Sequence, residues 1–329
     1  MAVVAGIDEA GYGPLLGPLV VSATAFHVPE DAARADLWEW FGSAVTRQAP
    51  RKSGRVRSRA ERCALWVADS KAMHKGGNGL RALEENLLPF LNLLWPQPKS
   101  VWELAGRRRS SSLPHISGYP WYRERDLDLP RVANAERMAE CCRNLRAGLA
   151  AAGAALCDAR VETLDVAEFN REVRQDGSKA VPLARRVAGL MQQLVEAFGQ
   201  EGLTLFVDRQ GGRKSYSPLL RAVFAPDRIE VVEESALSSE YVVSGGARRA
   251  RVRFEARADS RYLPVALASM LSKYTRELHM EMFNDFWRER VAGLVPTAGY
   301  YEDGLRFLSE IEPARAAEGI EREMLVRCK

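Results

Sequence analysis

Two adjacent acids near the N-terminus, Asp8 and Glu9, have clear chemical potential because they stand between an apolar run and a glycine-rich stretch. Residues 2–8 form a short β-branched run typical of a buried strand. A buried carboxylate without a partner is costly, or its pKa rises until the group is neutral. A divalent metal ion is the natural partner. The two acids can share one ion only if the strand ends there, because side chains alternate across a strand.

Glycines directly after the two acids would permit such a turn. Gly11 and Gly13 allow unusual backbone angles and let backbone N–H groups come close to a phosphate or a sugar hydroxyl. A dinucleotide-binding loop is also rich in glycine, but it requires a helix after the glycines, whereas residues 19–26 are typical of a second strand. A solvated acidic turn is the alternative without a ligand, and the apolar flanks disfavour it.

The elements that must position these acids follow along the chain. Residues 2–26 predict a hairpin, residues 203–208 a strand that ends in an acid, and residues 229–257 strands around a turn at Gly245 and Gly246. The other predicted elements are a strand at 159–164 and helices at 32–41, 79–95, 133–152, 166–174, 180–198, 262–286 and 302–327. Residues 96–130 are typical of a long inserted loop. This mixture, which contains no internal repeat, predicts an α/β domain with insertions.

The composition excludes a generally disordered chain, since 47% of the 329 residues are hydrophobic and 27% are charged. The net charge of +4 is a weak indication of a nucleic-acid partner. Residues 46–62 contain seven basic residues and one acid. That run favours either a solvated segment or a contact with phosphates.

The cysteines and histidines give no sign of a zinc site, because the five cysteines and four histidines lack the spacing of zinc ligands. The N-terminus has acids by position 8 and no basic region, unlike a secretory signal. The longest apolar stretch, residues 87–95, is too short to span a bilayer. We therefore expect a protein of the reducing cytoplasm with no membrane partner.

Four stretches together resemble one known family. The sequence GIDEAGYGPLLGPLVVSA, residues 6–23, closely resembles the first motif of the ribonuclease HII family. Residues 67–73 (VADSKAM), 203–209 (LTLFVDR) and 259–277 (DSRYLPVALASMLSKYTRE) are similar to its later motifs and occur in the family's order. The resemblance covers about half of the chain. Insertions at about 27–62, 96–158 and 226–257 lie outside it.

The resemblance implies a fold and a metal site. The fold would be a ribonuclease H-like mixed β-sheet flanked by helices, forming one elaborated catalytic domain over residues 1–329 with a helical C-terminal region at 262–329. Asp8, Glu9, Asp208 and Asp259 would form a catalytic site that binds two Mg²⁺ or Mn²⁺ ions. Cations would neutralise the mutual repulsion of four such acids.

The residues themselves agree with this assignment. Asp208 closes an apolar strand, where acids of α/β sheets commonly emerge, and Asp259 precedes a helix in which Pro264 fits an early position. Taken alone, Asp208 could simply start a loop and Asp259 could be a plain N-cap. In the implied mechanism one ion activates water and the other stabilises the departing 3′ oxygen, which leaves 3′-hydroxyl and 5′-phosphate ends.

Substrate contacts are implied at three further places. In the family's G-R-G loop the backbone amides contact the 2′-hydroxyl; here the loop is Gly11, Tyr12 and Gly13, which keeps both glycines and loses the arginine. Ser70 and Lys71 would contact phosphates, although the same residues could mark the start of a helix.

Two residues nearer the C-terminus complete the predicted set. Lys273 shares a helix face with Arg276 and could contact the nucleic-acid backbone or pair with local acids. Tyr300, in the segment PTAGYYEDGLRFL at 296–308, is similar to the tyrosine that packs beneath the sugar, and it could also be an ordinary loop aromatic.

The function implied is a metal-dependent endoribonuclease of DNA replication and repair. It would cut RNA in RNA–DNA hybrids and at ribonucleotides embedded in duplex DNA, and we expect a monomer. One alternative is a divergent ribonuclease H-like nuclease for another structured nucleic acid, since Tyr12 replaces the arginine. Another is a hybrid-binding module without turnover, which four intact acids disfavour.

Overall fold

The computed structural model describes residues 1–49, 63–68, 79–106, 118–123, 125–211 and 213–328. Its centre is a seven-stranded sheet in the order β5-β2-β1-β6-β9-β8-β7. These strands are β1 (Ala2–Ala10), β2 (Leu19–Val28), β5 (Ala155–Leu164), β6 (Leu203–Asp208), β7 (Arg228–Glu234), β8 (Ser238–Gly245) and β9 (Arg248–Glu255). A separate pair is formed by β3 (Val45–Thr46) and β4 (Leu65–Trp66).

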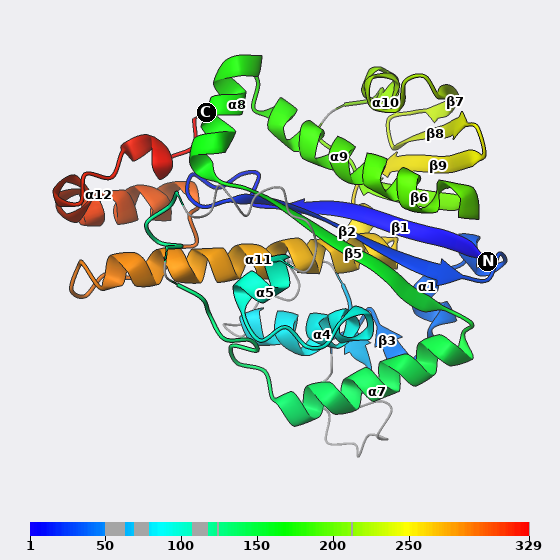
Figure 1. The fold of residues 1–329 in the computed structure, drawn as a ribbon, viewed down its shortest axis with the longest axis horizontal. Coiled ribbons are helices and arrows are strands. Elements are labelled where there is room, and N and C mark those ends of the chain that lie inside the picture. Colours follow the sequence, from blue (N-terminus) through cyan, green and yellow to red (C-terminus); the bar gives the residue numbers. More distant parts are fainter. Residues whose placement is uncertain (50–62, 69–78, 107–117, 124, 212, 329) are drawn as a thin grey trace.

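Helices flank this sheet, as Figure 1 shows. The α-helices are α1 (Leu37–Trp40), α4 (Gly79–Leu94), α5 (Val101–Gly106), α7 (Ala135–Ala151), α8 (Val166–Asp176), α9 (Ala180–Phe198), α10 (Ser217–Phe224), α11 (Leu263–Arg288) and α12 (Tyr301–Ala317). Short 3₁₀ turns are η1 (Ala32–Arg34), η2 (Gly42–Ala44), η3 (Gly199–Glu201), η4 (Ala258–Ser260) and η5 (Arg322–Met324). Among the described residues, no helix has the length and apolar character needed to cross a membrane.

The sheet is mixed. β1 runs antiparallel to β2 and β2 antiparallel to β5, whereas β1, β6 and β9 are parallel to one another. β9, β8 and β7 continue the same sheet as antiparallel neighbours, with the predicted turn at Gly245 and Gly246 between β8 and β9. The mixed α/β fold class that the sequence predicts is therefore confirmed.

Each face of the sheet buries its own apolar cluster. Val4 of β1 packs with residues of α4, α7 and α11, while Val3, Ala5 and Ile7 pack with residues of α8, α9 and α10. This division follows the alternation of side chains along a strand. In Figure 1 the two groups of helices lie on opposite sides of the sheet.

Helix α11 lies unusually close to β1. A Cβ atom at Gly6 would stand 2.3 Å from the backbone nitrogen of Val265, so only glycine leaves room for the helix. The hydroxyl of Thr24 donates to the carbonyl oxygen of Pro264 at 2.8 Å, which fixes the start of the helix on the neighbouring strand. Small residues of α11 such as Ser269 and Ser272 are buried at this contact.

Local differences from the predicted elements have identifiable causes. The helix predicted at 32–41 is broken into η1 and α1, because Asp36 is extended and caps a new helix through the backbone nitrogen of Trp38, 3.0 Å away. The loop at 96–130 contains the short helix α5. The final helix ends at Ala317, and Gly319 follows with a φ of 64°.

Candidate active site

The carboxyl ends of two central strands bring the first acids together. The last pair in the register of β1 and β6 is Ile7 with Val207, so Asp8 and Asp208 come next on neighbouring parallel strands. β2 still pairs with β1 as far as Ala10. Beyond Ile7, the edge of β1 that faces β6 is therefore open beside the two acids.

Asp259 reaches the same edge through the turn after β9. Asp208 is the last residue of β6, and its Oδ1 accepts a hydrogen bond from the backbone nitrogen of Ala258 at 2.8 Å. This bond ties the strand to η4, which contains Asp259. The N-cap of α11 is Tyr262, so Asp259 does not act as the N-cap of that helix.

The first strand extends two residues further than the sequence predicts. Asp8 and Glu9 both pair within β1, opposite Ser22 and Val21 of β2. The alternation of a strand places their side chains on opposite faces instead of at one turn. Among the residues that the structure describes, no three histidine, cysteine or acidic side chains are arranged to hold a metal ion.

The four acids are nevertheless close enough to act on one another electrostatically. Burial raises the pKa of Asp8 well above its usual range, and the charges of Glu9, Asp208 and Asp259 raise it further. Burial, with the charges of Asp208 and Asp259, raises the pKa of Glu9 to about 7. The pKa of Asp208 rises to about 6, mainly through burial, with Asp259 adding to the shift. The carboxylates thus form one cluster of like charges at this edge of the sheet.

Helix α11 supplies the polar groups beside these acids. The hydroxyl of Ser272 donates to the carbonyl oxygen of Asp8 at 3.0 Å, and a hydrogen bond from Ser269 lowers the pKa of the Asp8 side chain. The charge of Lys273 lowers the pKa of Glu9. Lys273 therefore lies near the acids, which agrees with the interpretation that it pairs with local carboxylates.

The glycine-rich loop after β1 is held by two buried arginines. Gly11 has a φ of 83°, and a Cβ atom there would stand 2.7 Å from the side chain of Arg276. Arg276 donates to the carbonyl oxygens of Leu16 and Ala298 at 3.1 and 3.0 Å, so it positions loops and does not face a substrate. Arg327 donates to the carbonyl oxygen of Gly11 as well.

Tyr12 and Gly13 line a pocket of about 340 Å³ beside this loop. The pocket also contains Lys179, whose Nζ lies 5.8 Å from the centre of the Tyr12 ring. Burial raises the pKa of Tyr12, and the charge of Glu9 adds to the shift. The pocket therefore lies next to the acids. A Cβ atom at Gly13 would meet nothing within 4 Å, so this glycine leaves open space.

The predicted tyrosine and its neighbour have different surroundings. Tyr300 is the N-cap of α12 and is 61% exposed. Its neighbour Tyr301 lines the pocket that contains Tyr12. Sequence reasoning missed Lys179, which belongs to no motif of the resemblance. It chose Tyr300 over Tyr301, which lies in the same segment at 296–308.

Two predicted substrate residues cannot be placed. Ser70 and Lys71 lie outside the described residues, as does most of the basic run at 46–62. Their assigned roles remain predictions.

Sequence reasoning also missed a buried acid next to Asp208. Glu255 ends β9 directly opposite Asp208 and is 3% exposed. It accepts a hydrogen bond from the hydroxyl of Tyr262 at 2.7 Å and pairs with Arg261, so it braces both ends of the turn that contains Asp259. The spacing of Glu255 from Asp259, with an arginine between them, gives no distinctive signal.

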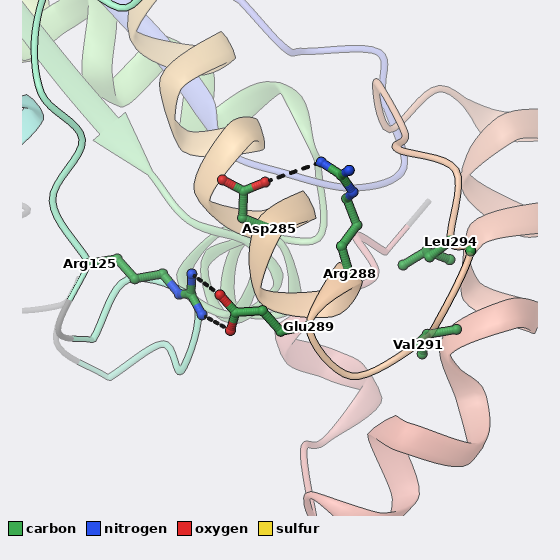
Figure 2. A pocket seen from close by; sticks show the side chains of 7 residues that line it. Arg125, Asp285, Arg288, Glu289, Val291 and Leu294 are labelled. Carbon is green, nitrogen blue, oxygen red and sulfur yellow. Dashed lines mark hydrogen bonds and ion pairs between the residues drawn. The ribbon is translucent and has the colours of Figure 1, made fainter.

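The larger pockets lie at the other end of α11. One of about 590 Å³ is lined by Arg125, Asp285, Arg288 and Glu289, among others (Figure 2). Arg125 donates to the carboxylate of Glu289 through both terminal nitrogens. A carboxylate oxygen of Asp285 lies 3.7 Å from a terminal nitrogen of Arg288. This pocket is about 24 Å along the helix from Ser272. Its charges are paired, so we do not place the chemistry there.

Comparisons with known proteins found similarity among solved structures. No protein-family model matches the chain, and no curated protein matches it. Ribonuclease HII from Archaeoglobus fulgidus, solved in complex with PCNA, is 17% identical over 99% of this chain and 94% of its own, with a TM-score of 0.43. Ribonuclease H2 from Pyrococcus horikoshii OT3 is 15% identical over 98% and 92%, with a TM-score of 0.42.

A third solved structure, Bst-RNase HIII in complex with Mn²⁺, is 16% identical over 99% of this chain and 66% of its own, with a TM-score of 0.46. The chain is thus similar to ribonucleases HII and HIII, the group that its sequence motifs resemble.

Proposed function

We propose that this protein is a metal-dependent endoribonuclease that hydrolyses RNA in RNA–DNA hybrids and at ribonucleotides embedded in duplex DNA. One observation carries the proposal: at one edge of the sheet, Asp8 and Glu9 lie near Asp208 and Asp259, and the charges of neighbouring acids add to burial in raising the pKa of Asp8, Glu9 and Asp208. A stable fold gains nothing from uncompensated like charges, whereas a cation-binding site requires them.

The donor set fits Mg²⁺ or Mn²⁺ because both ions prefer carboxylate oxygens. We propose that Asp8, Glu9, Asp208 and Asp259 would hold two such ions. When bound, these ions would supply the activation of water and the stabilisation of the departing 3′ oxygen.

The chain's own residues would prepare this edge for the reaction. Ser269 and Ser272 hold the Asp8 side chain and backbone, so its carboxylate stays fixed on β1. Backbone N–H groups of Ala258, Arg209 and Arg257 donate to Asp208 and favour its charged form. Lys273 offsets part of the negative charge near Glu9 before a cation arrives.

Substrate recognition is proposed for the glycine-rich loop and its neighbours. The open space at Gly13 would admit a sugar or phosphate close to the backbone of the loop that also contains Gly11 and Tyr12. Tyr300 is exposed and available for a sugar contact. Ser70, Lys71 and Lys273 remain the proposed phosphate contacts.

The wider setting remains a proposal as well. We propose a single catalytic domain over residues 1–329 that works as a monomer in the cytoplasm and serves DNA replication and repair. Basic residues of the insertions would hold the duplex or a partner protein, namely Arg51, Lys52, Arg55, Arg57 and Arg107 to Arg109.

The experiment is cleavage of three labelled duplexes in Mg²⁺ or Mn²⁺: all DNA, DNA with one embedded ribonucleotide, and an RNA–DNA hybrid. We expect cleavage of the two that contain RNA, with 5′-phosphate products. Cleavage of neither, by folded protein, would overturn the proposal. In that case other structured nucleic acids would be tested next, and binding of the hybrid without turnover would indicate a binding module.

A further inference from the structure

The pocket beside Tyr12 differs from the others in the charge of its walls. Its described lining includes the cations Lys179 and Arg327 and no carboxylate, whereas the pocket at the far end of α11 contains Asp285 and Glu289. Both cations come from segments far from Tyr12 in the sequence.

Lys179 has no acidic partner among the described residues. It is exposed at the N-cap of α9, directly after the tight turn that ends α8. The acid in that turn, Asp176, is paired with Arg185 at 3.0 Å. The ammonium group lies over the ring of Tyr12 at 5.8 Å, within the range of a cation–π contact. Lys179 is therefore directed toward the glycine-rich loop.

Arg327 adds a second, buried positive charge to the same pocket. It is 4% exposed and lies 4.9 Å over the ring of Phe169. Its Nε and one terminal nitrogen donate to the carbonyl oxygen of Gly17 at 3.0 and 2.7 Å. Burial and the neighbouring charge of Arg276 together lower the pKa of Arg327 to about 9, although the charge of Asp165 partly offsets them. An anion in the pocket would relieve this repulsion.

The position of the pocket and the polar groups on its walls also favour the binding of a phosphate. It lies at the N-terminus of α9, a helix of 19 residues whose dipole favours an anion there. The backbone nitrogens of Ala180 and Val181 already donate to Ser178, so the side chain of Lys179 would be the group that meets the anion. Tyr12 and Tyr301 provide two phenol groups on its walls. The acids of the active site are near enough for Glu9 to act on Tyr12.

We propose that Lys179 binds a backbone phosphate of the duplex in this pocket, with Arg327 holding the loop and strengthening the field. The proposal rests on the proposed function, because it assigns a substrate contact to the same site. The group recognised is a phosphodiester, and the side chain that meets it is Lys179.

Binding is the appropriate measurement, because it does not require turnover. We would measure the affinity of a fluorescent RNA–DNA hybrid by anisotropy in the Asp208→Asn background, over a range of salt concentrations. Lys179→Met is the test, Lys179→Arg restores the charge, and Lys99→Met is the matched control. Lys99 is exposed between α4 and α5 and lines none of the described pockets.

We expect Lys179→Met to weaken binding about fivefold at low salt and to reduce the slope of log affinity against log salt by about 0.9, the change for one lost phosphate contact. Lys179→Arg and Lys99→Met should keep the original slope. An unchanged slope in Lys179→Met would overturn the proposal.

A second arm separates the duplex from a free anion. Inorganic phosphate is added to wild type and to Lys179→Met while thermal unfolding is followed. If phosphate stabilises only the wild type and Lys179→Met binds the hybrid normally, the pocket holds a free anion and the proposal is wrong.

Cleavage by the wild type distinguishes failure of this proposal from failure of the proposed function. Cleavage by the wild type together with an unchanged salt slope in Lys179→Met would refute the phosphate contact and leave the proposed function standing. A reduced slope without any cleavage in Mg²⁺ or Mn²⁺ would refute the function and support the contact. A wild type that binds no duplex would refute both.

Discussion

Helix α11 has acids near both of its ends, but the charges that face them differ. Carboxylates face carboxylates at one end, whereas arginines face them at the other, where burial still raises the pKa of Asp285. At the end packed on β1, the acids Asp8 and Asp208 face further acids, and their pKa values are raised. At the far end Glu289 is bound by Arg125, whose hydrogen bond lowers its pKa. That far end also contains the larger pocket (Figure 2).

This difference in the surrounding charges distinguishes the far pocket from the proposed active site. Paired charges at a surface pocket satisfy one another and leave little net field for a ligand. Clustered acids at a sheet edge are unfavourable for the fold alone and become favourable when a cation binds. In this protein the distribution of charge, and not the volume of a pocket, therefore supports the proposed active site.

Removal of a carboxylate from the acidic edge, which is the part of the sheet that contains Asp8, Glu9, Asp208 and Asp259, should have the largest effect. We expect Asp208→Asn to reduce cleavage of the RNA–DNA hybrid by about 10³-fold, a loss typical of removing electrostatic stabilisation from a transition state. Single-turnover cleavage by Asp208→Asn would measure this loss, with Glu289→Gln as the control. Full activity in Asp208→Asn would mean that the acidic edge does not do the chemistry.

The close contact between β1 and α11 should be the next most sensitive feature. Gly6→Ala places a Cβ atom 2.3 Å from the backbone of Val265, and we expect a loss of about 3 kcal/mol of unfolding free energy. The matched control is Gly189→Ala on α9, where a Cβ atom meets nothing within 4 Å. Urea unfolding of both variants is the measurement, and equal stabilities would contradict the contact.

Sequence patterns predicted the features that depend on local runs. The strands that end near Asp8 and at Asp208, and the helix with small residues after Asp259, follow from apolar periodicity and from the acids that interrupt it. The end of β1 was predicted two residues too early, because its extension to Ala10 depends on pairing with Val20 of β2.

Features that depend on distant segments could not be predicted. Lys179 and Arg327 line one pocket beside the glycine-rich loop only because the start of α9 and the C-terminus both lie there. Figure 1 shows the C-terminus beside α8, the helix that precedes α9. Nothing in the local sequence around either residue marks a binding group. The same reason explains why Arg276, predicted beside Lys273 on one helix face, holds loops instead.

The acidic edge should also make the metal-free protein less stable as pH rises. The folded-state pKa values of Glu9 and Asp208, about 7 and about 6, exceed those of the unfolded chain, so the folded state keeps these protons longer. Their stabilising contribution is full below about pH 4 and is lost as pH rises through the folded pKa values.

We would follow this effect by urea unfolding with a chelator between pH 4 and pH 8. The variant Asp208→Asn should lose less stability than the wild type over this range, because one of the titrating groups is absent. Addition of Mn²⁺ should restore stability to the wild type at high pH. Identical pH profiles for the wild type and Asp208→Asn would be inconsistent with the raised pKa.

The smallest effect is expected at the paired end of α11. Glu289 is largely exposed, so Glu289→Gln should change the unfolding free energy by less than about 1 kcal/mol and leave hybrid cleavage unchanged. Thermal unfolding and the cleavage assay would measure the two quantities. A large loss of cleavage would show that the far pocket takes part in the reaction.

The most direct test of the central claim is calorimetric titration of the protein with Mn²⁺ at pH 7.5. We predict that the wild type and Glu289→Gln bind Mn²⁺ with the same affinity and stoichiometry, and that Asp8→Asn and Asp208→Asn bind it at least about tenfold more weakly, because each loses a charged ligand. Equal Mn²⁺ binding by all four proteins, or none by the wild type, would contradict the account.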